Sequence, residues 1–416
     1  MKTIQLAIIG GGSAGMSAAI AAKQQGIQDI MIFERSEELG GILQQCIHNG
    51  FGLQVFKEEL SGPMYAQRFI EQVYTQSIHI QLKTTVIEVT MDREILYVNQ
   101  KEGYVWIKAD AIIFSSGCFE RNRGAIQIPG KRLPGVYTAG SAQRYLNMEN
   151  IRVGKRVFIL GSGDIGLIMA RRMTLEGASV VGVAEIMPYS NGLTRNIVQC
   201  LKDYDIPLYL SHTIVDIQGK QHVERVVIAQ VDEQKQPIVG SEKTFEVDCV
   251  LLSIGLIPEN ELGKQIQLDI DPRTKGACVN EFFETSVPHV YACGNALHVH
   301  DIVDYVTMEA QSAGKSAAND ILNQMRSEES YITTCKGNVS YVLPQRISRQ
   351  VQEDVTLCFR VKQPCKNVDI IIRDGSRIIK TIHKRIVLPA EMERISIKKE
   401  DIQELQQGIQ VEVCVK

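Results

Sequence analysis

Residues 4–34 read IQLAIIGGGSAGMSAAIAAKQQGIQDIMIFE, and their pattern is the strongest indication of the fold. An apolar run leads into a Gly-x-Gly-x-x-Gly turn, an alanine-rich helix, a second apolar run and a terminal glutamate. Residues 157–185, VFILGSGDIGLIMARRMTLEGASVVGVAE, repeat that order, and in both copies the glutamate follows the first glycine by 24 residues. Strand, glycine turn, helix and acid together are specific for a dinucleotide-binding unit. The chain is therefore predicted to bind two dinucleotides.

Each part of the turn has a physical role. The first glycine permits the tight turn, the second lets a pyrophosphate approach the backbone, and the third lets the helix pack on the strand. The phosphates then lie at the helix N-terminus, where free N–H groups and the helix dipole favour an anion. The predicted contacts are Gly10, Gly12, Ser13, Ala14, Gly15, Glu34 and Arg35 in the first copy, and Gly161, Gly163, Asp164, Ile165, Gly166 and Glu185 in the second. The alternative is that both are ordinary glycine turns in nucleotide-free sheets.

Composition narrows the class of protein. The 416 residues carry a formal net charge of −3 and no basic tract, so we expect no nucleic-acid partner. No apolar run approaches the roughly 20 residues that a membrane span needs. The ten cysteines are dispersed, with no Cys-x-x-Cys pair, and this usage is typical of a reducing cytoplasm. We therefore expect a cytoplasmic protein without a direct membrane span.

The order of the segments predicts three domains. Residues 59–76 read as a helix, 78–116 as a small antiparallel meander that begins near Ile80, and about 305–325 as a helix with one small-residue face. The second glycine turn lies inside an insert, after which the chain returns to the first domain. The expected fold is α/β, with two doubly wound Rossmann-like domains, one inserted in the other, and a C-terminal all-β sandwich. The expected boundaries are 1–122 with 258–328, 123–257, and 329–416.

From Thr333 onward, helical periodicity gives way to short alternating runs. Asp374-Gly375 between two of them is a strong hairpin signal, and about seven short strands indicate a sandwich. This region carries no cofactor motif. We hypothesise that it docks a partner through a free outer face, and that its deletion would leave NADH-driven dye reduction intact.

The chain resembles the FAD- and NAD(P)-binding pyridine-nucleotide oxidoreductases. The resemblance rests on both glycine turns, on the strand ends at Gly117 and Gly255, and on the closing motif Tyr291-Ala-Cys-Gly-Asn295. Within that family, residues 40–52 are most similar to the α-type flavoprotein subunits of sarcosine, opine and proline oxidases. Bacterial proteins of that kind accompany a second flavoprotein that resembles glycerol-3-phosphate dehydrogenase. The resemblance covers residues 1–328 and implies FAD at the first turn and NAD at the second.

It also implies where the chemistry occurs. The loop after Glu34 and the segment after the closing motif would both face the flavin, so that Cys46, His48, His298, His300, Asp301 and Asp304 would converge on it. His48 and Cys46 are the catalytic candidates, and Gly41, Gly117, Gly294, Asn295 and His300 join the predicted FAD contacts. The disulfide reductases carry two redox cysteines in this loop, but here Leu43 and His48 stand at those positions. No metal site is predicted, because His298 and His300 lack a third imidazole or thiolate ligand at useful spacing.

NAD(H) is favoured over NADP(H), because residues 186–190 after Glu185 contain no Arg or Lys to balance a 2′-phosphate. The leading functional hypothesis is an electron-transfer subunit that passes electrons between NAD(H) and FAD and works with a second flavoprotein dehydrogenase. One alternative is a stand-alone NADH oxidase or peroxidase that uses Cys46. The other alternative is a non-catalytic assembly subunit, in which an adenine nucleotide is held for structure.

Overall fold

The computed structural model describes residues 1–322 and 329–415, and it divides the chain into two compact units. The first unit joins Met1–Cys118 to Pro258–Lys416, and the second is Phe119–Ile257. The chain passes between them at β9 (Cys118–Glu120) and β18 (Leu256–Pro258), which pair as a two-stranded ladder. No helix within the described residues is both long enough and apolar enough to cross a membrane.

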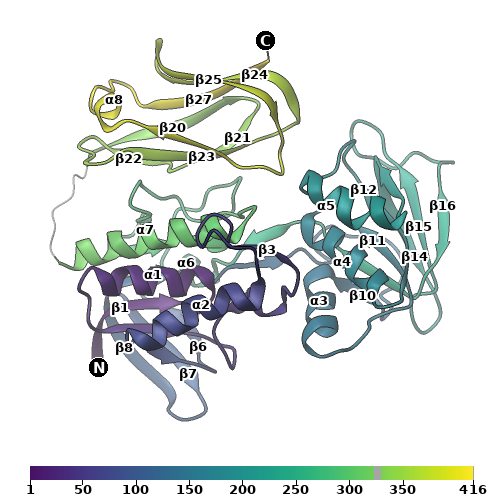
Figure 1. The fold of residues 1–416 in the computed structure, drawn as a ribbon, viewed down its shortest axis with the longest axis horizontal. Coiled ribbons are helices and arrows are strands. Elements are labelled where there is room, and N and C mark those ends of the chain that lie inside the picture. Colours follow the sequence, from purple (N-terminus) through teal and green to yellow (C-terminus); the bar gives the residue numbers. More distant parts are fainter. Residues whose placement is uncertain (323–328, 416) are drawn as a thin grey trace. The chain divides into compact units, whose positions relative to one another are not determined.

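The main sheet of the first unit has seven strands (Figure 1). Its order is β5-β2-β1-β8-β7-β6, with β19 beside β8. The strands are β1 (Lys2–Ile9), β2 (Ile30–Phe33), β5 (His79–Gln81), β6 (Thr85–Val89), β7 (Glu94–Asn99), β8 (Gly103–Phe114) and β19 (Val290–Ala292). β6, β7 and β8 form the predicted antiparallel meander, but β5 runs parallel to β2 at the opposite edge. The expectation of a meander strand near Ile80 was therefore wrong, because the preceding helix returns the chain to the β2 edge as a parallel crossover.

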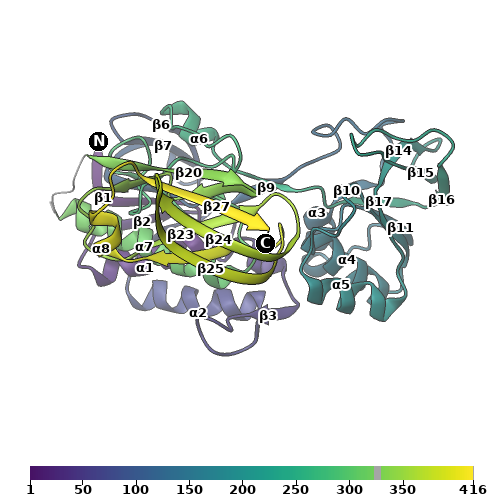
Figure 2. The same cartoon turned by 90° about the horizontal axis from the view of Figure 1, so that it is seen from above.

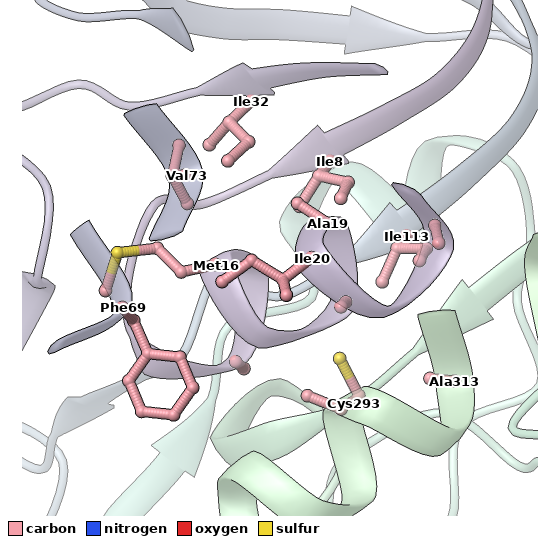
Figure 3. Close-up of a cluster of buried hydrophobic side chains, with 14 of the residues drawn as sticks. Ile8, Met16, Ala19, Ile20, Ile32, Phe69, Val73, Ile113, Cys293 and Ala313 are labelled. Carbon is pink, nitrogen blue, oxygen red and sulfur yellow. The ribbon is translucent and has the colours of Figure 1, made fainter. Parts of the chain in front are cut away.

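Three helices cover one face of this sheet: α1 (Ser13–Gln24), α2 (Gly62–Thr75) and α7 (Val303–Ile321). Figure 3 shows the layer beneath them, where Ile8 of β1 lies between its register partners Ile32 and Ile113. A Cβ on Gly314 of α7 would lie only 2.2 Å from the carbonyl oxygen of Ala18 in α1. The two helices therefore touch backbone to backbone, and the small-residue face predicted for α7 is what permits this contact. The predicted end of that helix, at residue 325, lies outside the described residues.

Short elements connect these layers. They are η1 (Gly41–Gln45), β3 (Asn49–Phe51), β4 (Leu60–Ser61), α6 (Glu261–Gln265) and η3 (Gly294–Ala296). η1 and β3 follow the first glutamate, and η3 follows β19. Both segments therefore leave the carboxyl edge of parallel strands, where open α/β sheets bind their ligands.

The second unit repeats the plan on a smaller scale. Its parallel sheet has the order β10-β17-β11-β12-β13, and an antiparallel sheet β14-β15-β16 packs on one face. The strands are β10 (Val136–Thr138), β11 (Arg156–Leu160), β12 (Ser179–Glu185), β13 (Leu208–Leu210), β14 (His212–Gln218), β15 (Arg225–Gln230), β16 (Lys243–Glu246) and β17 (Cys249–Leu252). The helices on the other face are α3 (Ala139–Met148), α4 (Asp164–Leu175) and α5 (Thr194–Cys200), with η2 (Lys202–Tyr204) after them.

The C-terminal region is the predicted all-β sandwich, in yellow-green and yellow in Figures 1 and 2. One sheet has the order β22-β20-β27-β24-β25 and the other β21-β23-β26, and an apolar core lies between them. The strands are β20 (Ser330–Gly337), β21 (Val339–Leu343), β22 (Arg346–Ser348), β23 (Val355–Val361), β24 (Cys365–Asp374), β25 (Arg377–Val387), β26 (Glu393–Ile397) and β27 (Ile409–Val415), with α8 (Lys399–Gln403). The hairpin at Asp374-Gly375 forms as predicted, since Asp374 pairs with Arg377.

The sandwich is not an independent module. Four of its side chains, Tyr341, Leu343, Cys358 and Met392, are buried in one apolar cluster with residues of the first sheet and of the closing segment. Its contacts place it inside the first compact unit. These buried contacts argue against a freely removable domain, an expectation that only deletion of the sandwich tests. Alternation shows which side chains of a strand are buried, but not which element buries them.

Candidate functional site

The first glycine turn has the geometry that its sequence requires. Gly10 lies at φ +112°, and a Cβ there would be 2.5 Å from the carbonyl oxygen of Ser115. A Cβ on Gly15 would be 1.8 Å from the carbonyl oxygen of Gly10. Around Gly12, by contrast, a Cβ would meet no atom of the chain within 4 Å. Gly10 and Gly15 must therefore be glycine because a side chain would clash with the protein's own backbone. Gly12 instead leaves open space for a ligand.

The N-terminus of α1 suits an anion. Gly12 is its N-cap residue, it supplies no side-chain cap, and the first turn holds no acid. Glu34 is buried at the end of β2, where its Oε2 accepts from the Gly11 amide at 2.8 Å and its Oε1 from the Ser36 amide at 2.7 Å. The next residue, Arg35, is exposed. An uncapped helix end with a buried acid beside it fits the pyrophosphate and ribose of a dinucleotide.

The second turn repeats these contacts. Gly161 lies at φ +93°, and a Cβ there would be 2.1 Å from the carbonyl oxygen of Ser253. Glu185 is 3% exposed, and its two oxygens accept from the amides of Ser162 at 3.0 Å and Met187 at 2.9 Å. These are the equivalents of the two bonds that Glu34 makes. The sequence repeat is therefore a repeat of hydrogen bonds as well.

Side chains distinguish the second turn from the first. The Ser162 hydroxyl donates to Glu185 at 2.6 Å and accepts from the Asn191 amide at 2.9 Å. The Asp164 carboxylate, in the first turn of α4, accepts from the Leu193 amide at 2.8 Å and from Asn196 at 2.6 Å. The loop after β12 is thus tied to the turn. Gly163, Ile165 and Gly166 lie beside it, and the Gly166 amide donates to the Ser253 hydroxyl. Sequence reasoning missed Ser162 and Ser253, which no spacing rule identifies.

The loop after Glu34 packs on the first turn. Gly41 lies at φ +55°, and a Cβ there would be 3.2 Å from the Cα of Gly12. The Gly40 amide donates to the Gly11 carbonyl at 2.9 Å. Gly117, at φ +78°, lies just after β8, the strand beside β1, with open space around the position of its missing Cβ. The predicted contacts Gly41 and Gly117 therefore both lie at the carboxyl edge of the sheet.

The two catalytic candidates are held by local contacts. The Cys46 thiol donates to the Ile42 carbonyl at 3.2 Å, and burial raises its pKa to about 12. His48 is half-buried, its Nδ1 lies 3.0 Å from the Asn49 carbonyl, and its ring packs on Phe51. A thiol with so high a pKa stays protonated throughout the neutral range, and the thiolate is the nucleophilic form.

We therefore expect Cys46→Ser to change NADH-driven dye reduction by less than about twofold. The raised pKa leaves a negligible thiolate fraction at any pH below about 10, so the thiol adds little to the chemistry. Stopped-flow reduction of the wild-type and variant proteins measures this directly. A large loss of rate together with full flavin content would instead favour the oxidase or peroxidase that depends on Cys46.

The closing motif leads into a buried cluster of His298, His300 and Glu309. The Oε2 of Glu309 lies 2.7 Å from Nε2 of His298 and 3.2 Å from Nε2 of His300, and its Oε1 accepts from the Gly294 amide at 2.8 Å. Burial alone would raise the pKa of Glu309, but the two histidines hold that pKa well below its usual range. Asn295 accepts from the His300 amide at 3.0 Å.

Glu309 was missed, and its signal in the sequence was an acid on the small-residue face of α7. The three side chains have the composition of a metal site, since their ligand atoms lie within 4.8 Å of one another. However, 2.7 Å is the separation of an N–H···O hydrogen bond. We therefore interpret the cluster as a carboxylate that accepts from two imidazoles.

The two aspartates of this segment lie in different places. Asp304 is buried, and it accepts from the amides of Gly52, Gln54 and Val55 at 2.8 to 3.0 Å. It therefore ties α7 to the loop after Cys46 and His48, so the two predicted segments do meet. Asp301 instead points to the β-sandwich, where it pairs with Arg360.

Two sheets, each with parallel strands around a glycine turn, an uncapped helix end and a buried glutamate, have the geometry of two dinucleotide-binding domains. Residues 4–317 match the family described as "Pyridine nucleotide-disulphide oxidoreductase", and the chain belongs to that family. The family uses FAD and NAD(P)H, so the predicted cofactors and enzyme class are confirmed at this level.

Several curated proteins are similar to the chain. Hydrogen cyanide synthase subunit HcnB of Pseudomonas protegens is 24% identical over 312 residues, which are 69% of this chain and 65% of that protein. The NAD(P)H sulfur oxidoreductase (CoA-dependent) of Pyrococcus abyssi is 29% identical, over 71% of this chain and 63% of that protein. The glutamate synthase [NADPH] small chain of Escherichia coli is 25% identical, over 77% and 68%. The chain spans just under two thirds of the length of the first two relatives.

Solved structures support the fold. Thioredoxin reductase of T. acidophilum superposes with a TM-score of 0.63 at 23% identity, over 78% of this chain and all of that one. L-Proline dehydrogenase of P. horikoshii gives a TM-score of 0.54 at 17% identity, over 78% and 57%. Two Rossmann-like domains, one inserted in the other, are therefore confirmed as the fold.

Proposed function

We propose that this chain passes electrons between NAD(H) and an FAD held at the first glycine turn, as the electron-transfer subunit of a larger enzyme. The observation that carries the proposal is the repeated arrangement of glycine turn, uncapped helix and buried glutamate. The open space at Gly12 receives the pyrophosphate, and Glu34 orients the ribose. FAD would supply the redox chemistry when bound, and Gly294, Asn295 and His300 are the residues of the closing segment proposed to contact it, with the Asn295 amide on a ribityl hydroxyl.

NADH should reduce the bound flavin at least about tenfold more efficiently than NADPH. A 2′-phosphate would be placed against the Glu185 carboxylate, and a tenfold difference needs only about 1.4 kcal/mol of repulsion. Anaerobic stopped-flow reduction with each nucleotide measures the preference. Glu185→Gln keeps the size of the side chain while removing its charge, so it should narrow the difference. If neither nucleotide reduces the flavin, the second site holds a structural adenine nucleotide instead.

A partner subunit remains part of the proposal. Two of the relatives are named as parts of larger enzymes, a "subunit" of hydrogen cyanide synthase and a "small chain" of glutamate synthase. The proposed partner is a second flavoprotein that oxidises a small metabolite of the glycerol-3-phosphate or amino-acid type. Copurification of the native protein tests this, and a chain that purifies alone with full turnover on a small oxidant contradicts it.

The proposed compartment is the cytoplasm, since none of the ten cysteines, all of which lie in the described residues, forms a disulfide. A sulfur reductase is a second candidate, because the relative from Pyrococcus abyssi bears that name. That activity would need a reactive thiol, and the raised pKa of the half-buried Cys46 disfavours it. Assays with and without polysulfide therefore separate the two candidates.

A further inference from the structure

The segment between η3 and α7 is clamped by the C-terminal β-sandwich. Arg360 of β23 pairs with Oδ1 of Asp301, and the same guanidinium donates to the Val299 carbonyl at 3.0 Å. The Met392 amide donates to Oδ2 of Asp301 at 2.7 Å. Both oxygens of Asp301 are therefore bound by the sandwich, and Arg360 binds the two residues that flank His300, Val299 and Asp301.

The sandwich holds the Arg360 guanidinium in turn. Its Nε lies 3.2 Å from the Tyr341 hydroxyl, and its Nη1 donates to the Pro389 carbonyl at 3.0 Å. The Arg360 side chain is 16% exposed and that of Asp301 is 10% exposed, so the pair is largely withdrawn from water. A planar guanidinium held by four partners is a rigid support, which a flexible lysine would not reproduce.

The contacts of Arg360 with Val299 and Asp301, here called the clamp, act on the segment that contains His298 and His300. The Tyr341 ring packs edge-on against His298, with ring centroids 6.2 Å apart. His300 stands between Val299 and Asp301, both of which Arg360 binds, and its amide donates to Asn295. Leu297 belongs to the apolar cluster that Tyr341 and Met392 complete. The position of His300 and Asn295 therefore depends on the sandwich.

We propose that Arg360 is a positioning residue for the dinucleotide site of the first unit, acting through Val299 and Asp301 on His300 and Asn295. The C-terminal sandwich thereby fixes the position of residues in that site. The inference rests on the proposed binding of FAD at the first turn. It assigns a role to a region that carries no cofactor motif of its own.

A second contact between the same two regions supplies a matched control. The Ser348 amide donates to both oxygens of Glu281 at 3.1 Å, and Gln345 exchanges two hydrogen bonds with the backbone of Val279. These hydrogen bonds join the sandwich to the chain before β19, at residues other than the segment of His298 to Asp301. Glu281→Gln therefore weakens the docking of the sandwich but leaves the clamp in place.

The experiment measures FAD affinity and the flavin midpoint potential of the full-length protein carrying Arg360→Met, Arg360→Lys, Asp301→Asn or Glu281→Gln. We expect Arg360→Met and Asp301→Asn each to weaken FAD binding about tenfold or more and to shift the potential. Their combination should be no worse than either change alone, because both remove the same clamp. Arg360→Lys should recover only part of the loss, and Glu281→Gln should bind FAD as the wild type does.

Thermal unfolding of the flavin-free proteins shows whether each variant is folded. Wild-type affinity and potential in folded Arg360→Met and Asp301→Asn proteins would overturn the inference. An equal loss in Glu281→Gln would also overturn it, since the effect would then come from docking in general. A wild-type protein that binds no FAD would instead contradict the proposed function, so the two failures are distinguishable.

Discussion

Gly12→Val should give a folded protein that has lost its flavin. A Cβ at this position meets no atom of the chain within 4 Å, and φ is −75°, which any L-residue adopts. The substitution therefore costs the apo fold little. The branched side chain fills the space that a pyrophosphate needs at the end of α1, and overpacking of about 1–3 kcal/mol corresponds to roughly 5- to 150-fold weaker binding. Flavin absorbance after purification and titration of the apoprotein with FAD measure the loss.

The second glycine turn supplies the control for that result. Gly163→Val places the same side chain at the equivalent position of α4, where the nearest atom to a Cβ is the Ser253 hydroxyl oxygen at 3.0 Å. This variant should keep its FAD and lose reduction by NADH. A Gly12→Val protein that is yellow with full flavin content would show that the first turn does not hold FAD.

The glycine turns, and with them the fold, could be predicted because their constraints are local. Gly10 and Gly161 need positive φ, and the glutamate 24 residues later must end the next strand. Both requirements involve residues that are close together in the sequence, so the sequence alone shows them. The meander and the hairpin at Asp374 follow in the same way from alternation and turn chemistry.

The rest of the candidate site depends on contacts between distant segments. Asp301 and Asp304 are three residues apart, yet one binds the sandwich and the other binds the amides after Gly52. Asp301 and Asp304 have different partners because their side chains point in different directions, which the sequence does not show. Glu309 was missed although it lies on the small-residue face of α7, because its partners His298 and His300 lie in an irregular loop whose path no periodicity predicts.

Deletion of residues 329–416 should abolish flavin binding and strongly destabilise the remaining protein. The truncated chain would expose the side of the first sheet where Tyr341, Leu343, Cys358 and Met392 are buried. Each large apolar side chain contributes about 1.5–3 kcal/mol when fully buried, so losing these contacts removes a large fraction of a typical stability of about 5–15 kcal/mol. The truncation would also release Asp301, and with it the segment of His300.

The comparison that isolates this effect uses Ile378→Lys, a change on the exposed strand β25, where Ile378 is 55% exposed. That variant keeps the sandwich and should unfold at the wild-type temperature with full flavin content. The truncated protein should instead be recovered in low yield, without flavin and with a much lower unfolding temperature. If residues 1–328 purify as a yellow protein and reduce a dye at the wild-type rate, the sandwich is a removable docking module after all. The buried contacts of Tyr341 and Arg360 would then be irrelevant to the site, because the core would have kept its shape without them.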